Sequence, residues 1–252
     1  MEKLGIVSFS KMGMGLNKES SGYHMIEDLA EEISGRPVYK IWSNWPKDMD
    51  GYKEQNLHVK KYIQTLLAKY ERLLVFTEDH SLVSGIFSSF GAEPFNMTYI
   101  DSHPDFNTWT SSISKLPHGM SLATLCGMEG RYFQELAGNV ASLQIIGGYE
   151  IEPQEIVLLN YLGYKCEKIA DFKYRGDHGN NGLSLDLDAI KDFKTCNYHV
   201  GRMRYEDIRP IISELRNSKI IEISEFNPDN GYGDYEKNII NDLLRMVITG
   251  AS

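Results

Sequence analysis

Short apolar runs alternate with longer segments of helical periodicity along the chain, and this alternation constrains the fold more than any other feature. A run such as residues 73–76 is typical of a strand buried on both faces, and apolar residues three and four positions apart, as in residues 52–70, are typical of a helix. Strands are predicted at residues 4–9, 38–42, 73–77, 97–100, 142–148, 165–170, 183–188 and 219–224, and helices at residues 23–33, 52–70, 81–90, 118–126, 153–162, 205–216 and 235–248. About eight strands alternating with helices predict an α/β fold, with a mostly parallel sheet between two layers of helices.

The composition sets limits on partners and location. No internal repeat, low-complexity tract or linker divides the chain, so a single domain is expected over residues 1–252. The formal net charge of -9 argues against nucleic acids and anionic membranes as partners and suits a cationic substrate. No apolar run approaches the length of a membrane span and nothing near Met1 resembles a signal peptide, so we expect a cytoplasmic protein. The three cysteines Cys126, Cys166 and Cys196 are far apart, which predicts no disulfide framework and fits a reducing compartment.

The stretch Asp101-Ser102-His103-Pro104-Asp105 directly follows a predicted buried strand. In an extended chain, residues two positions apart point to the same side, so two carboxylates and an imidazole are expected to converge. Pro104 cannot donate to a sheet ladder, which indicates that the chain leaves the sheet here. Ligands bind at the carboxyl ends of strands in open α/β sheets, and this stretch is therefore a candidate site.

Polar residues follow other predicted strands in the same way. The candidate cluster consists of His80, Asp101, His103, Asp105, Asp186 and Asp188. Four carboxylates held close together oppose burial unless cations compensate their charge. Oxygen-rich ligation with some imidazole suits manganese or magnesium-like ions, and two such ions about 3.5–4 Å apart can lower the pKa of a shared water.

Taken singly, these residues also have plain structural interpretations. A bare D-x-H-x-D pattern also fits a solvated turn, and a lone histidine is more often structural than a ligand. Asp186 and Asp188 fit an exposed strand end, Glu225 fits a strand terminus, and His118 fits the start of a helix. The remaining histidines, His24, His58, His178 and His199, stand in no motif and are interpreted as surface or core residues. The glycines of the predicted loop at 11–15 lack the spacing of a phosphate-binding motif.

Five short motifs occur in order between residues 79 and 228. They are Asp79-His80-Ser81, Asp101-Ser102-His103-Pro104-Asp105, His118-Gly119-Met120, Ser184-Leu185-Asp186-Leu187-Asp188 and Glu225-Phe226-Asn227-Pro228. Together they resemble the motifs of the ureohydrolase family, which holds arginases, agmatinases and their relatives. Three departures stand out: Thr77-Glu78 replaces the two glycines usual before the first motif, Pro104 replaces a smaller residue, and no Asp-Pro follows Asp188.

The resemblance implies a three-layer α/β fold of the arginase type with two Mn²⁺ ions. One ion would be held by His80, Asp101, Asp105 and Asp186, and the other by Asp101, His103, Asp186 and Asp188, so that Asp101 and Asp186 bridge the ions. In the family, a bridging hydroxide attacks the guanidinium carbon, and urea and an amine are released. By this resemblance His118 is the catalytic proton-transfer group, Glu225 orients the guanidinium, and Asp105 also hydrogen-bonds the hydroxide.

The segment between Asp105 and His118 resembles the arginase loop that binds the α-carboxylate and α-amino groups of arginine. Its candidate substrate-binding residues are Asn107, Ser112 and Ser114, and Glu152 falls where arginases place an aspartate near the α-amino group. Leu116 stands where an asparagine is expected, which removes one carboxylate contact. L-Arginine is therefore the predicted substrate. The variants at Glu78 and Pro104 also resemble arginases that act on arginine within a peptide, for which Trp109 and Leu116 would line a wider mouth.

Three classes of function remain open. The first is a hydrolase of arginine or another guanidino compound, such as peptidyl arginine, agmatine or guanidinobutyrate. The second is another metal-dependent amidohydrolase on this fold, such as a formiminoglutamase or a deacetylase-like relative, and the third is a catalytically silent binding protein. Six ligands together with Glu225 favour the first class, because a one-zinc deacetylase does not need them all. The resemblance also implies assembly into homotrimers or homohexamers.

Overall fold

The computed structural model describes residues 2–10, 12, 22–43, 45–173, 180–194, 196 and 200–250. It contains one sheet of eight strands in the order β2-β1-β3-β8-β7-β4-β5-β6, and every neighbouring pair is parallel. The strands are β1 (Glu2–Phe9), β2 (Tyr39–Ile41), β3 (Tyr70–Thr77), β4 (Phe95–Asp101), β5 (Val140–Gly147), β6 (Cys166–Glu167), β7 (Asn180–Asp186) and β8 (Ile220–Ser224). The predicted α/β fold with a mostly parallel sheet is confirmed.

Helices cover both faces of this sheet. The α-helices are α1 (His24–Ser34), α2 (Met49–Leu67), α3 (Val83–Ser88), α4 (Ser121–Leu125), α5 (Pro153–Leu162), α6 (Tyr205–Leu215) and α7 (Asp234–Thr249). The 3₁₀ turns are η1 (His80–Leu82), η2 (Pro117–Met120), η3 (Gly130–Leu136), η4 (Ile169–Asp171), η5 (Leu187–Ala189) and η6 (Pro228–Asn230). In the described part of the chain, no helix has the length and apolar character needed to cross a membrane.

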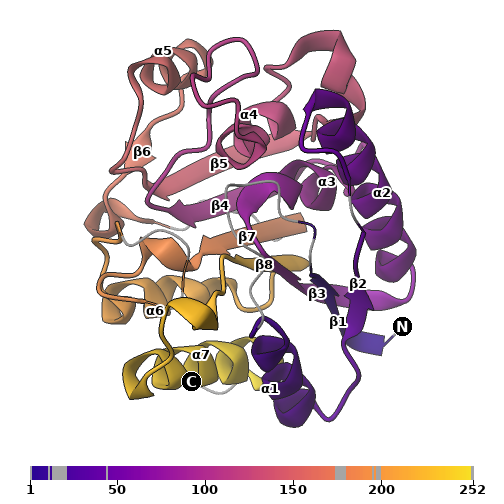
Figure 1. The fold of residues 1–252 in the computed structure, drawn as a ribbon, viewed down its shortest axis with the longest axis vertical. Coiled ribbons are helices and arrows are strands. Elements are labelled where there is room, and N and C mark those ends of the chain that lie inside the picture. Colours follow the sequence, from indigo (N-terminus) through magenta and orange to yellow (C-terminus); the bar gives the residue numbers. More distant parts are fainter. Residues whose placement is uncertain are drawn as a thin grey trace.

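Two apolar cores separate the three layers. Along β3, Leu74 and Phe76 pack toward α1, α6 and α7, whereas Leu73 and Val75 pack toward α2, α3, α4 and α5. This follows from the strand geometry, in which successive side chains point to opposite faces. Figure 1 shows α1, α6 and α7 grouped on one side of the sheet and α2 to α5 on the other.

Several predicted boundaries need correction. The strand predicted at 165–170 is only the two-residue edge strand β6, because it pairs with β5 alone and the chain then turns into η4. The helix predicted at 81–90 is divided into η1 and α3, and α2 begins three residues before its predicted start, where the Asp48 side chain accepts a hydrogen bond from the Gly51 amide. The predicted loop at 174–182 ends early, since β7 already begins at Asn180.

Some sequence predictions fall outside the described residues. These are the loop at 11–15 apart from Met12, the first six residues of the loop at 174–182, and the histidines His178 and His199.

The strand order brings four polar strand ends together. The neighbouring strands β3, β8, β7 and β4 occupy the middle of the sheet and all run in one direction. Their carboxyl ends therefore open on the same edge, where open α/β sheets bind ligands. Three of these strands end in, or are followed by, residues of the predicted cluster, and β8 is followed by Glu225, the residue predicted to orient the guanidinium.

Candidate metal centre and substrate pocket

His80 reaches the centre from the turn that follows β3. The Asp79 side chain caps this turn by accepting a hydrogen bond from the Ser81 amide at 2.9 Å, so His80 is held in the first position of η1. The imidazole Nδ1 lies 2.9 Å from Asp101 Oδ2, 3.3 Å from Asp105 Oδ2 and 3.4 Å from Asp186 Oδ2. The ring is buried, and its Nδ1 therefore faces three carboxylates from two other strand ends.

Asp101 is the last residue of β4, and the chain turns back on it directly. The His103 amide donates to Asp101 Oδ1 at 2.7 Å, and the His103 ring places its Nδ1 3.5 Å from the same oxygen. Gly147, at the end of β5, permits this close packing, because a Cβ there would lie 2.1 Å from the Asp101 carbonyl oxygen. Asp101 and His103 therefore converge as predicted, although the chain between them is bent and not extended.

Asp186 ends β7, and Asp188 lies in the following turn. The strand predicted to continue to Asp188 stops two residues earlier, because the Asp186 side chain accepts the Asp188 amide at 2.7 Å and caps η5. Asp188 still faces the centre, with its Oδ2 3.1 Å from His103 Nδ1. The two acids are thus brought together by a cap, and not by the period of a strand.

The ligand atoms form two groups that share Asp101. One group is His80, Asp101 and Asp186, the other is Asp101, His103 and Asp188, and within each group the potential ligand atoms lie within 4.8 Å of one another. Asp186, Asp188 and Glu225 form a third such group. Five of the six predicted metal ligands are thus gathered in these groups, and the sixth, Asp105, adjoins them through His80.

The charge balance of the centre favours cations. Burial, and then the neighbouring carboxylates Asp188 and Asp101, raise the pKa of Asp186 well above its usual range. Burial and Asp101 raise the pKa of Asp188 to about 6. Among the described residues that line the pocket over this centre, none is a lysine or arginine. The donor set of carboxylates and imidazoles therefore fits divalent metal ions.

Asp105 and Glu225 both adopt backbone conformations that side chains disfavour. Their φ angles are 48° and 67°, and such strain in a non-glycine residue is often found at functional sites. The Asp105 carbonyl accepts the amides of Leu122 and Ala123 at 3.2 and 3.3 Å, which holds the turn in place. Glu225 is buried with its Oε2 accepting no hydrogen bond from the described residues. Burial, followed by Asp186 and Asp188, raises the pKa of Glu225 well above its usual range.

A pocket of about 150 Å³ opens over the centre. It is lined by the predicted metal ligands His80, Asp101, His103, Asp105 and Asp186, by the predicted catalytic residues His118 and Glu225, and by Asn107, Ser112, Ser114, Gly119, Glu150, Glu152 and Glu155. Every residue predicted to contact substrate is therefore present in the lining. Trp109 and Leu116, predicted to line a wider mouth, are not: the Trp109 ring instead packs edge-on against Tyr52, with ring centroids 6.2 Å apart.

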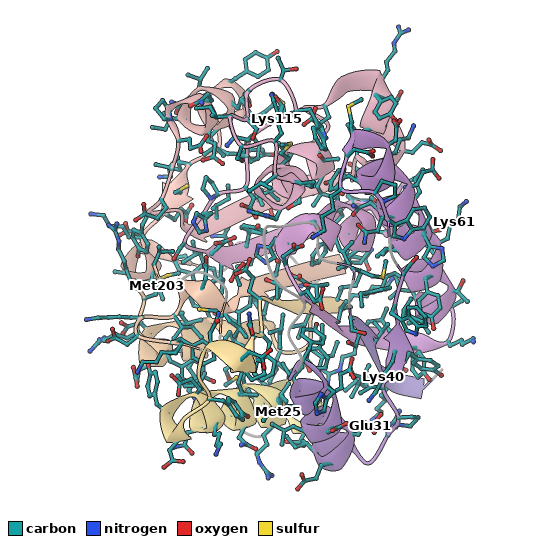
Figure 2. The ribbon with its side chains drawn as sticks, viewed as in Figure 1. Met25, Glu31, Lys40, Lys61, Lys115 and Met203 are labelled. Carbon is teal, nitrogen blue, oxygen red and sulfur yellow. The ribbon has the colours of Figure 1, made fainter. Side chains whose placement is uncertain are left out.

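The segment between Asp105 and His118, which is predicted to bind substrate, makes polar contacts with the rest of the protein. Asn107 Nδ2 donates to Glu152 Oε2 at 3.1 Å, and the Asn107 amide donates to the Gly119 carbonyl at 3.1 Å. The Lys115 ammonium donates to the Trp109 carbonyl within the loop. In Figure 2, Lys115 lies on the same side of the sheet as α4 and α5. The loop thus carries Asn107, Ser112 and Ser114 over the carboxyl edge of the sheet.

Sequence reasoning missed three buried residues of the site. Glu222 lies in the middle of β8, accepts hydrogen bonds from Thr77 and from Ser184 at 2.6 Å, and approaches His80 Nε2 at 3.5 Å. A glutamate inside the apolar run at 220–223 was a signal that could have revealed it. Tyr99 contacts His80 and Asp105, but an aromatic residue in a strand gives no such signal.

Glu155 was also missed, because a glutamate in the first turn of a predicted helix gives no sign of a role in a site. Its carboxylate accepts the amides of Phe106 and Glu152, both at 2.9 Å. Burial raises its pKa to about 7. Glu155 therefore connects α5 to Phe106, at the start of the segment predicted to bind substrate.

The fold and the centre define an α/β protein with an acidic, imidazole-containing cluster suited to divalent metal ions at the carboxyl edge of its sheet. No protein-family model matches the chain. A curated arginase of Brevibacillus brevis is 24% identical over 250 residues, covering 89% of this chain and 83% of that protein.

The fold of the chain is also similar to those of solved arginase structures. The arginase of Bacillus subtilis superposes with a TM-score of 0.83 at 20% identity, over 100% of this chain and 99% of that one. The Entamoeba histolytica arginase in complex with L-ornithine gives 0.82 at 19% identity, with the same coverage. Formimidoylglutamase of Bacillus subtilis gives 0.72 at 12% identity, over 99% and 87%, and a putative agmatinase of Clostridium difficile gives 0.68 at 13%, over 99% and 98%. The resemblance to the ureohydrolase family and the arginase-type fold are therefore confirmed.

Proposed function

We propose that this protein is a metal-dependent hydrolase of C–N bonds in linear amidines, which releases urea from a guanidino substrate. L-Arginine is the proposed substrate and L-ornithine the proposed amine product. The observation that supports this proposal most strongly is that the two ligand groups sharing Asp101 adjoin one pocket, which is also lined by Glu225, Asn107, Ser112, Ser114 and Glu152. The curated relative and several solved structures that resemble the chain are arginases, which supports this choice.

The proposed cofactor is a pair of Mn²⁺ ions. His80, Asp101, Asp105 and Asp186 would hold one ion, and Asp101, His103, Asp186 and Asp188 the other. A pair of divalent ions supplies a nucleophile near neutral pH by lowering the pKa of a water molecule. The buried carboxylates would at the same time lose the mutual repulsion that raises the pKa values of Asp186 and Asp188.

The remaining residues of the pocket have distinct proposed roles. Glu225, buried next to Asp186 and Asp188, binds the guanidinium of the substrate and holds its carbon over the centre. A carboxylate with an unused acceptor atom suits the donor-only guanidinium, which offers five N–H groups and accepts none. His118, which lines the same pocket, transfers the proton that the departing amine needs.

Other residues of the pocket suit the α-substituents of arginine. Glu150, Glu152 and Glu155 line the pocket together and favour an ammonium group. Asn107, Ser112 and Ser114 supply neutral donors for a carboxylate, and such donors discriminate strongly because a substrate without matching groups leaves them unpaired.

The alternative substrates share the reacting group but differ at the other end. They are peptidyl arginine, agmatine and guanidinobutyrate, together with the formimino compound formiminoglutamate. These compounds remain alternative substrates because the chain is also similar to a formimidoylglutamase and a putative agmatinase. Cytoplasmic location and assembly into a homotrimer or homohexamer remain predictions, and light scattering on the purified protein tests the assembly.

A substrate panel tests the proposal directly. Urea release should be compared, as kcat/KM with Mn²⁺-loaded protein, for arginine, agmatine, guanidinobutyrate and an arginine-containing peptide. Formiminoglutamate should be included with product detection for formamide. Arginine is expected to exceed every other compound. A tenfold preference for another compound, about 1.4 kcal/mol of transition-state free energy, contradicts the choice of substrate.

A further inference from the structure

The side chain of Tyr99 joins two residues of the metal centre. Its hydroxyl donates to Asp105 Oδ2 at 2.5 Å and lies 2.6 Å from His80 Nδ1. The tyrosine is fully buried in β4, two residues before Asp101 and therefore on the same side of the strand. These contacts place a phenol between two groups that the proposed function assigns to one ion.

Asp105 needs such a partner more than the other carboxylates do. The Asp101 side chain is oriented by the His103 amide, and the Asp186 side chain by the Asp188 amide, each at 2.7 Å. For Asp105, two amides from the start of α4 fix the carbonyl, and hold a backbone with φ of 48°, but they do not bind the carboxylate. The Asp105 carboxylate instead accepts a hydrogen bond from the side-chain hydroxyl of Tyr99.

Tyr99 also packs on the imidazole of His80. The ring centroids lie 4.9 Å apart with the planes inclined at 43°. On the other side of that imidazole, Nε2 lies 3.2 Å from Ser184 Oγ and 3.5 Å from Glu222 Oε2. The ring of His80 is thus confined from two directions, with Nδ1 directed toward Asp101, Asp105 and Asp186.

We propose that Tyr99 is a positioning residue for the ion held by His80 and Asp105, and that it acts through its hydrogen bond to the Asp105 carboxylate. Donation to Oδ2 turns the carboxylate so that its remaining acceptor capacity faces the ion, before any ion binds. Partners of this kind around metal ligands contribute about 10- to 100-fold in metal affinity. The hydrogen bonds of Tyr99 go to His80 and Asp105, which are assigned to this ion, whereas His103 and Asp188 are assigned to the other one. This inference rests on the proposed two-metal function, and it concerns the affinity of one ion alone.

The test measures Mn²⁺ binding and not turnover. Metal-free wild type, Tyr99→Phe and the control Tyr52→Phe are titrated with Mn²⁺ by calorimetry, and bound metal is counted after gel filtration. Tyr52 is equally buried and loses a comparable hydroxyl, which bonds Ser84 and not the centre. Tyr99→Phe is expected to weaken one of two binding events about tenfold and leave the second unchanged, while Tyr52→Phe binds as wild type does.

Measurements in a second variant, Asp105→Asn, distinguish positioning of the carboxylate from a general loss of structure around the centre. In Asp105→Asn the carboxylate that Tyr99 orients is gone, so adding Tyr99→Phe is expected to change Mn²⁺ affinity less than twofold. Circular dichroism and the Tm of each metal-free variant confirm that it is folded. Equal weakening of both ions, unchanged or tighter binding in Tyr99→Phe, or the same tenfold loss in the Asp105→Asn background would each overturn the assignment. If wild type itself bound no divalent ion, the proposed function would fail instead, so the two failures are distinguishable.

Discussion

Nδ1 of His80 lies 2.9 Å from Oδ2 of Asp101, although two strands, β8 and β7, separate β3 from β4 in the sheet. Three strand spacings amount to about 14 Å, which a histidine side chain cannot cross from within a strand. The turn η1, capped by Asp79, carries His80 over the ends of the intervening strands. The contact between these two residues therefore depends on the strand order as much as on the motifs themselves.

Asp101→Asn and Asp186→Asn are expected to be the most damaging single substitutions. In the proposed arrangement both carboxylates contribute to both ions, so each change removes one negative charge from both ion positions. Binding of Mn²⁺ at both positions should weaken, and urea release should fall below detection. Bound metal and urea release measured on the same samples check this. Two tightly bound ions in Asp101→Asn would show that this carboxylate does not bridge.

His118→Ala is expected to separate turnover from metal binding. His118 lines the pocket but belongs to none of the ligand groups. Loss of a proton-transfer group lowers kcat by about 100-fold, whereas both Mn²⁺ ions should remain. Metal analysis together with kcat measures both effects. Release of an ion from His118→Ala would make His118 a ligand or a structural residue.

Glu152→Gln is expected to raise KM for arginine more than it lowers kcat. Glu152 lies at the start of α5, where it accepts a hydrogen bond from Asn107 and lines the pocket with Glu150 and Glu155. The amide keeps the hydrogen bond but removes the charge that favours the α-amino group. Guanidinobutyrate, which has no amino group there, should lose less kcat/KM than arginine does. An equal loss for both compounds would contradict a contact with the α-amino group.

The metal-free protein is expected to become less stable as the pH rises from about 4 to about 8. The pKa is raised to about 6 for Asp188, by burial and Asp101, and to about 7 for Glu155, by burial. Because both values lie above those of the unfolded chain, near 4, the folded state binds protons more tightly. The stabilisation that protonated Asp188 and Glu155 give to the folded state is present below about pH 4 and is lost as the pH rises through 6 and 7.

Thermal unfolding across this range checks the sign. In excess Mn²⁺ the trend should reverse, because the ions compete with protons for the same carboxylates. A metal-free Tm that rises with pH in the same way as the metal-loaded one would contradict this account of the centre.

Much of the fold was predictable because the strands of a covered parallel sheet contain short apolar runs, such as residues 73–76 of β3. The prediction failed where tertiary contacts decide the boundary. β6 is shortened because an edge strand is paired on one side, and β7 ends at Asp186 because a side-chain cap replaces the ladder. The sequence motifs indicated the candidate ligands, whereas Tyr99 gave no signal in the sequence. Glu222 stood out only as a charge in an apolar run, because its contacts depend on which strands become neighbours.

The most direct test of the central claim is a titration of metal-free protein with Mn²⁺, in which bound metal and urea release from arginine are followed together. The account predicts that activity is absent after chelation and dialysis, and that it reaches its full value when two ions are bound per chain. Full activity in protein verified to contain no metal, or no urea at any Mn²⁺ occupancy, would contradict it.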